Sequence, residues 1–160
     1  MDKERSAQRP LIRLPNATAQ RGVSLLEVLV AVLVLAIGVL GAVAMQISAL
    51  RYNASAAYTT QASFLAYDML DRMRANVDHL PSYVTNVNTP CAAGNPGGSI
   101  LATDQQDFAH AVSCLLPGGY GSVAVQGNNA TVTIGWSEER ILAGGGTTEF
   151  VISSMIRGDL

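Results

Sequence analysis

Hydrophobic positions are concentrated in one uninterrupted stretch near the N-terminus. From Val28 to Leu50 there are 23 consecutive residues without a charge, and only Gln46 and Ser48 are conspicuously polar. About 20 apolar residues in a helix are enough to cross the hydrocarbon core of a membrane. The pattern therefore predicts a transmembrane helix over residues 23–50.

The helical pattern continues beyond this apolar stretch. Between Gly41 and Pro81 there is neither glycine nor proline, so nothing in this run breaks a helix. Apolar side chains recur every three or four residues and so share one face. They are Tyr58, Ala62, Leu65, Met69, Met73, Val77 and Leu80. We therefore expect one helix from Ser24 to Val77, about 80 Å long, which is amphipathic over 51–80 and is ended by "HLP".

The rest of the chain predicts a small globular part, residues 81–160. Residues 81–102 contain three prolines and indicate an irregular loop, after which Thr103 caps a short helix with Asp104 and Asp107 near its positive end. The apolar face of this helix is expected to consist of Phe108, Ala111, Val112 and Leu115.

Alternating patterns predict three strands near the C-terminus. They cover residues 122–126, 130–136 and 149–156, and "GNN" joins the first two as a hairpin. An antiparallel sheet of these strands needs the exposed half of the long helix to cover its apolar face. The expected fold class is α+β, with a long N-terminal helix packed on a small antiparallel sheet.

Charge divides sharply at the apolar stretch. Residues 1–22 carry five Lys or Arg against two acids, a net charge of +3, whereas the rest carries five Arg against ten acids, a net charge of −5. Basic residues favour the cytoplasmic flank, which predicts a cytoplasmic N-terminus and a periplasmic C-terminal part. The acidic balance speaks against a nucleic-acid partner. An ordinary secretory signal has an apolar core of only about 7–15 residues, so a signal anchor is the simplest alternative.

The two cysteines, Cys91 and Cys114, both follow the apolar stretch. In an oxidising periplasm a disulfide between them would close a loop and stabilise the domain by about 3 kcal/mol. Two unpaired thiols in a reducing compartment are the alternative. A metal site is not expected, because His79 and His110 lack ligand spacing relative to the cysteines.

Catalytic signatures are absent from the sequence. Lys3 is the only lysine, so no phosphate-binding P-loop exists, and neither G-x-S-x-G nor H-E-x-x-H occurs. The adjacent carboxylates Glu138 and Glu139 are interpreted as part of a solvated turn, "SEER". We therefore expect no catalytic residues, no cofactor and no enzymatic activity.

One charge stands out, because Glu27 lies at the start of the apolar helix, where a carboxylate is costly. The junction "QRGVSLLEVLVAVLVLAIGVLG" joins a basic flank, Gly22, Ser-Leu-Leu and this glutamate to an uninterrupted apolar helix. It resembles the class III signal of the type IV pilin superfamily. The resemblance implies that prepilin peptidase cuts between Gly22 and Val23, removing leader 1–22, and that Val23 is then N-methylated. Glu27 becomes the fifth residue of the mature chain and has a role in assembly and register.

Later motifs narrow the resemblance. "AYDMLDRMRANVDHL" (66–80), "CAAG", "CLLPGG" and "VTIGW" look most like the PilV-type minor pilins. Major pilins usually have phenylalanine at the new N-terminus and a proline within the span. This chain has Val23 and no proline between Pro15 and Pro81, which disfavours a role as the main filament subunit.

The resemblance implies a minor pilin that takes part in priming pilus assembly or in a tip complex. Its implied partners are other minor pilins, the major pilin, prepilin peptidase, the inner-membrane assembly platform and membrane lipid. The implied location is the bacterial inner membrane and then the pilus on the cell surface. Two alternatives stay open: a minor pseudopilin of a type II secretion system, and a signal-anchored periplasmic enzyme or binding module.

Overall fold

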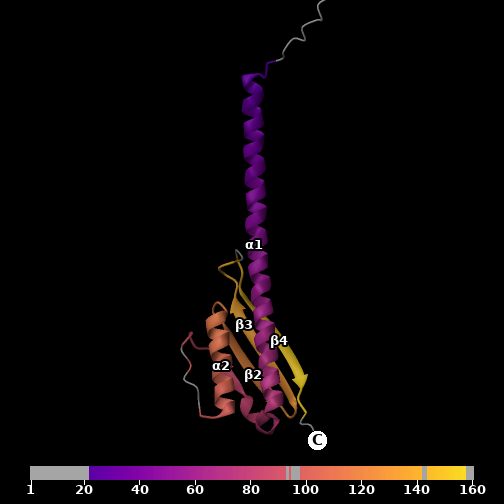
Figure 1. The fold of residues 1–160 in the computed structure, drawn as a ribbon, viewed down its shortest axis with the longest axis vertical. Helices are drawn as coiled ribbons and strands as arrows, with labels where there is room; N and C mark the ends of the chain where they lie inside the picture. The colour runs from indigo at the N-terminus through magenta and orange to yellow at the C-terminus, as the bar shows by residue number, and fades with distance from the viewer. Residues whose placement is uncertain (1–21, 93, 95–97, 142–143, 158–160) are drawn as a thin grey trace, which may run out of the picture. The chain divides into compact units, whose positions relative to one another are not determined.

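The structure, a computed structural model, describes residues 22–92, 94, 98–141 and 144–157. Its elements, in chain order, are α1 (Leu25–Ala75), the 3-10 helix η1 (Val77–Tyr83), β1 (Thr85–Val87), α2 (Ile100–Leu115), β2 (Tyr120–Gln126), β3 (Asn129–Ser137) and β4 (Thr147–Met155). Figure 1 shows the fold as a ribbon, with α1, α2, β2, β3 and β4 labelled. The expected α+β class is confirmed. Residues 1–21, nearly all of the expected leader, lie outside the described residues.

The chain divides into two compact units, with the boundary after Ala42. In the first unit α1 begins one turn before Val28, because the carbonyl of Ser24 accepts hydrogen bonds from the backbone N–H groups of Glu27 and Val28 at 3.0 and 3.2 Å. The helix continues to Ala75 without a break, as the glycine- and proline-free run predicted.

The expected end of the long helix at Val77 was wrong. The α-helix ends at Ala75, and residues Val77–Tyr83 form a 3-10 helix that contains Pro81. Asn76 accounts for the change, because its side-chain amide donates to the Tyr83 hydroxyl at 3.1 Å. This contact favours a tighter turn, in which Leu80 and Tyr83 are buried.

The second unit contains a four-stranded antiparallel sheet with the strand order β1-β2-β3-β4. The expected hairpin joins β2 to β3, where Gln126 pairs with Asn129 and Gly127 has a φ of +59°. A positive φ is easily reached by glycine, which explains this residue in the turn. The expected count of three strands was wrong, since β1 lies within the segment interpreted as a loop.

The core of this unit is formed by residues of α1, η1, α2 and the sheet. Val132, Ile134 and Trp136 point to the same side of β3, as their alternation predicted, and all three are fully buried. From α1 the core receives residues that share one side of the helix. These are Ala62, Ala66, Met69, Leu70 and Met73. Of the expected face of α1, Tyr58, Leu65 and Val77 lie at the margin and are partly buried.

Helix α2 begins earlier than the sequence suggested. Ser99, not Thr103, is the N-cap, and its hydroxyl accepts a hydrogen bond from the Ala102 N–H at 3.2 Å. Thr103 lies inside the helix and donates its hydroxyl to the Ser99 carbonyl. Of the expected apolar face, Phe108 and Val112 are buried and Ala111 is partly buried. Leu115 was wrong, because it is exposed, and Leu116, the C-cap residue, is buried in its place.

Candidate processing and assembly site

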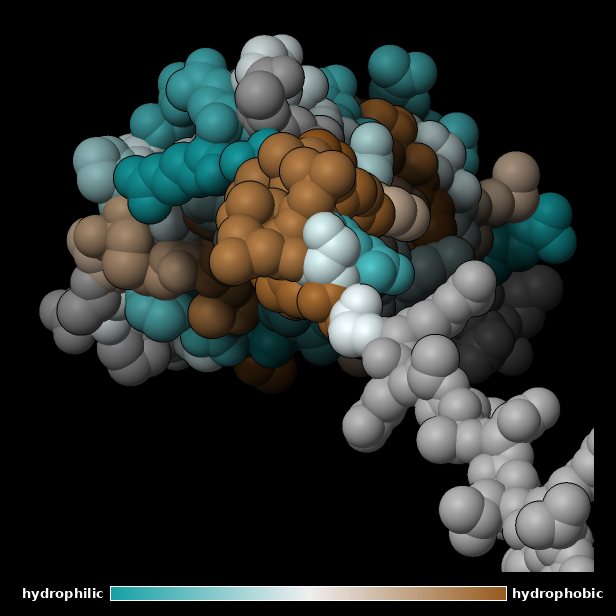
Figure 2. All heavy atoms as spheres, turned by 90° about the horizontal axis from the view of Figure 1, so that it is seen from above, coloured by the Kyte–Doolittle hydropathy of each residue, from teal (hydrophilic) through white to brown (hydrophobic). Residues whose placement is uncertain are grey.

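The first unit presents apolar side chains to its surroundings on every side. Among residues 22–50 none is buried, and the Leu25 side chain is 78% exposed. Figure 2 looks onto this end of α1, where hydrophobic residues gather on the visible surface. α1 is long and apolar enough to cross a membrane, as judged from length and composition. A helix that is apolar all round requires lipid or protein around it.

Glu27 is the only charged residue between Arg21 and Arg51. It lies in the first turn of α1, where the partial positive charge of the helix N-terminus favours a carboxylate. Val23 and Glu27 lie on one side of the helix and line a shallow groove with Val28, Ala31, Val32 and Leu35. An ammonium group at Val23 would therefore lie on the same side of the chain as this carboxylate.

Gly22 and Val23 precede the helix and have no regular secondary structure. Both are exposed, and a Cβ added at Gly22 would meet no atom within 4 Å. The peptide bond between them therefore lies outside the helix.

Residues 18–43 match the prokaryotic N-terminal methylation motif. This motif covers the junction with Gly22, Val23 and Glu27 and most of the apolar stretch. The match supports a similarity to the pilin superfamily and a function of the type IV pilin or pseudopilin type. Together with the apolar helix it fits a membrane-anchored structural protein processed by prepilin peptidase. No curated protein and no solved structure matches the chain significantly.

In the second unit Cys91 and Cys114 form a disulfide with a Cα–Cα distance of 4.7 Å. The bond ties the segment after β1 to the last turn of α2. It closes a loop with a sequence separation of 23 residues, part of which lies outside the described residues.

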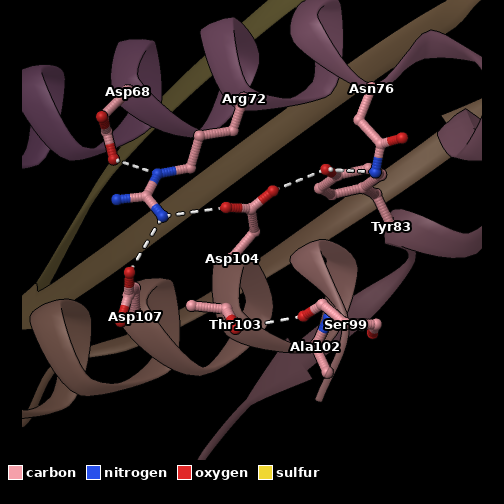
Figure 3. Close-up of polar contacts among 9 residues, drawn as sticks. All are labelled: Asp68, Arg72, Asn76, Tyr83, Ser99, Ala102, Thr103, Asp104 and Asp107. Carbon is pink, nitrogen blue, oxygen red and sulfur yellow. Dashed lines mark hydrogen bonds and ion pairs between the residues drawn. The ribbon is translucent and has the colours of Figure 1, made fainter. Parts of the chain in front are cut away.

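A polar cluster joins α1 to α2, with Arg72 at its centre (Figure 3). The guanidinium of Arg72 donates to Asp68 and Asp104 at 2.9 Å and to Asp107 at 3.0 Å. Asp68 lies four residues before Arg72 on α1, a spacing that places the two side chains on the same face of the helix. Asp104 and Asp107, however, lie beyond the first turn of α2 and neutralise Arg72 rather than the helix N-terminus.

Burial alone would lower the pKa of Arg72, but hydrogen bonds to Asp107, Asp104 and Asp68 outweigh it and raise the pKa above its ordinary value. Asp104 is buried and also accepts a hydrogen bond from the Tyr83 hydroxyl at 2.6 Å (Figure 3). Burial, followed by this bond, raises the pKa of Tyr83. Each charge in the cluster has a partner, so the cluster holds the two helices together and offers no reactive group.

The interpretation of "SEER" as a solvated turn was wrong for one of its residues. Glu138 is buried, with 6% of its surface exposed, whereas Glu139 is exposed. The Glu138 carboxylate accepts hydrogen bonds from the Ser55 hydroxyl at 2.6 Å and from the Trp136 indole at 3.2 Å. Local sequence carries no signal for this contact, because Ser55 lies 83 residues away.

Proposed function

We propose that the protein is a minor pilin of the type IV pilus, of the PilV type, that takes part in assembly priming or in a tip complex. The observation that carries the proposal is the position of Glu27. It is the only charge on an otherwise exposed apolar segment, and it lies within a methylation motif at a fixed distance from Gly22 and Val23.

In this proposal prepilin peptidase removes residues 1–22 at the cytoplasmic face by cutting between Gly22 and Val23. The new N-terminal residue, Val23, is then N-methylated. The absence of regular structure at these two residues and the lack of neighbours around Gly22 support access by the peptidase.

Cleavage creates an ammonium group at Val23, one helical turn from the Glu27 carboxylate. In the water-poor centre of a filament, either charge left unpaired costs several kcal/mol. Pairing the ammonium of one subunit with the carboxylate of a neighbour therefore favours one axial register. Before assembly, Glu27 lies near the cytoplasmic interface, where water and headgroups keep its cost moderate.

The division of charge supports a single span, over residues 23–50, with a cytoplasmic N-terminus and a periplasmic part that comprises residues 51–160. The proposed partners are the major pilin, other minor pilins, prepilin peptidase, the inner-membrane assembly platform and membrane lipid. After assembly the protein would reside in the pilus at the cell surface.

Mass spectrometry of the mature N-terminus tests the processing step. We expect a chain that begins with N-methylated Val23, and an intact Met1 or an uncut Gly22–Val23 bond contradicts the proposal. A signal-anchored periplasmic enzyme or binding module would retain these residues.

The variant Glu27→Gln tests the assembly step. It should enter the membrane normally and be cut at the same bond, but it should be strongly depleted from isolated pili. Glu139→Gln is the matched control, because Glu139 is exposed and far along the chain from the span. Normal incorporation of Glu27→Gln would overturn the role of this carboxylate. Recovery of the processed chain with a type II secretion apparatus rather than with pili would assign the minor pseudopilin alternative.

A further inference from the structure

The strand β4 forms a free edge of the sheet. In the strand order β1-β2-β3-β4 it pairs with β3 alone, through all nine of its residues (Figure 1). The opposite edge strand, β1, has only three residues. An edge strand leaves one row of backbone N–H and C=O groups without strand partners, so β4 offers the longer template for another strand.

The edge lacks the features that usually prevent pairing with another chain. The register from Asn129↔Met155 to Ser137↔Thr147 is one-to-one, so no bulge twists β4 away. Residues Thr147–Met155 contain no proline or lysine, and their single charge is Glu149. That carboxylate already accepts a hydrogen bond from the Tyr120 hydroxyl at 2.8 Å on the sheet surface.

The core is also incompletely covered at this edge. Phe150 and Ile152 pair with Ile134 and Val132 of β3, which are fully buried, yet both β4 side chains are only partly buried. On the other face of β4, Val151 is 55% exposed. A further strand beside β4 would bury apolar surface on both faces.

We propose that an extended segment of a different protein in the same assembly adds to β4 as a fifth strand of the sheet. Backbone hydrogen bonds to the free edge would provide affinity, and alternating apolar side chains would pack beside Phe150 and Val151. Arg157, just beyond the strand, is exposed and pairs with no carboxylate among the described residues. We therefore expect the added segment to carry an acidic residue where it lies beside Arg157, at the C-terminal end of β4.

A second copy of this chain is disfavoured as the occupant, an argument that rests on the proposed membrane anchoring. In a closed two-fold dimer, β4 of one copy can pair with β4 of the other only in the antiparallel sense. A parallel pair would need a two-fold axis along the strands, and such an axis would place each N–H opposite the same N–H of the other copy. The two copies of α1 from Val43 onward would then run in opposite directions. Two chains anchored in one membrane leave it from the same face, and the opposite directions of residues 43–75 disfavour such a dimer.

Photo-crosslinking tests this proposal in the full chain, expressed in the cells in which it assembles. A benzoylphenylalanine placed at Met155, which is 59% exposed, should form an adduct with another pilin-like protein. Mass spectrometry should map the adduct to an extended segment that contains an acidic residue. Val151→Lys should lower the adduct yield about fivefold or more, because a lysine guards a strand edge against pairing.

Ala124→Lys is the matched control, since Ala124 is exposed on β2, away from the edge, and this variant should keep the adduct. Both variants should unfold at the temperature of the parent chain. No adduct, an adduct with a second copy, or a yield unchanged by Val151→Lys would overturn the proposal. The mature N-terminus is measured in the same samples: an uncut chain contradicts the pilin proposal, whereas a cut chain without an adduct contradicts only the added strand.

Discussion

Ser55 of α1 donates its hydroxyl to the carboxylate of Glu138, 83 residues later, over a distance of 2.6 Å. The same carboxylate oxygen accepts the indole N–H of Trp136 at the end of β3. A buried carboxylate thus fixes the end of the sheet to the helix that covers it. The backbone N–H of Glu138 donates to the Gly146 carbonyl, which also positions the chain that leads into β4.

Replacing Glu138 with alanine should lower the free energy of unfolding of the second unit by about 1–3 kcal/mol, because the Trp136 N–H would stay buried without an acceptor. Glu138→Gln keeps an acceptor and should cost less. Thermal unfolding of the purified full chain, followed by circular dichroism, measures the change. Glu139→Ala, at an exposed position, is the control and should stay within about 0.5 kcal/mol. Equal effects of the two alanine variants would contradict the role given to Glu138.

The raised pKa of Tyr83 leads us to expect a loss of stability at alkaline pH. Burial and the hydrogen bond to Asp104 raise its pKa in the folded chain above the ordinary value near 10. A tyrosine whose pKa is higher in the folded chain than in the unfolded chain stabilises the fold fully at any pH below its unfolded pKa. This contribution is lost as the pH rises through the pKa of the folded chain. The parent chain should therefore lose stability above about pH 10. Tyr83→Phe should be less stable at neutral pH but should show a shallower alkaline decline.

The hydroxyl of Tyr120 contributes in the same direction, since its hydrogen bond to Glu149, followed by burial, raises its pKa. Combining Tyr83→Phe with Tyr120→Phe should flatten the alkaline decline further. Urea unfolding at a series of pH values between 7 and 11 measures these slopes, and an unchanged decline in the double variant would refute the assignment.

Arg72 and Arg74, two residues apart on α1, should contribute differently to the free energy of unfolding. Arg72→Ala removes the partner of Asp104, which is buried, and should cost about 1.5–3 kcal/mol of unfolding free energy. Arg74 pairs with the exposed Asp71 and contacts Ser154, so Arg74→Ala should cost about 1 kcal/mol or less. Denaturant titration of both variants decides the point. A larger effect of Arg74→Ala would show that the Arg72 cluster does not connect the helices.

The disulfide between Cys91 and Cys114 should matter mainly for stability. In the chain-entropy account, closing a loop of this size stabilises the folded state by about 3 kcal/mol. Replacing both cysteines with serine should lower the unfolding free energy by that order while the mature N-terminus stays the same. If reducing agent leaves the unfolding temperature of the parent chain unchanged, the bond does not contribute in this way.

Local sequence patterns correctly predicted the helices and strands whose formation depends mainly on neighbouring residues. The run without glycine or proline predicted a continuous helix, and the alternation of Val132, Ile134 and Trp136 predicted a strand with one buried face. Both are confirmed. Such features depend on periodicity within a few turns or residues, which a single sequence displays directly.

Contacts between distant segments account for the errors. β1 exists because Thr85–Val87 pair with β2, and no pattern in three residues reveals a partner more than 30 positions away. Ser99 and Thr103 are both good caps, so the choice between them depends on where α2 can pack. Glu138 appeared to belong to a polar turn because its partner Ser55 lies on another element.

The close approach of Tyr120 to Gly135 gives the sharpest test of the sheet surface. The two residues pair across β2 and β3, and the Tyr120 ring lies over Gly135, so an added Cβ would overlap with the ring. Gly135→Ala should therefore cost about 1–3 kcal/mol, although alanine is ordinarily tolerated better than glycine in a strand.

A double-mutant cycle isolates this contact. In a Tyr120→Ala background, Gly135→Ala should be neutral or stabilising, because the ring that it meets is gone. Tyr120→Phe is the control: it removes the hydrogen bond to Glu149 but keeps the ring, so Gly135→Ala should remain costly. Thermal unfolding of the six chains provides the coupling energies. A cost of Gly135→Ala that is the same in all three backgrounds would mean that backbone geometry, and not the tyrosine ring, requires glycine at this position.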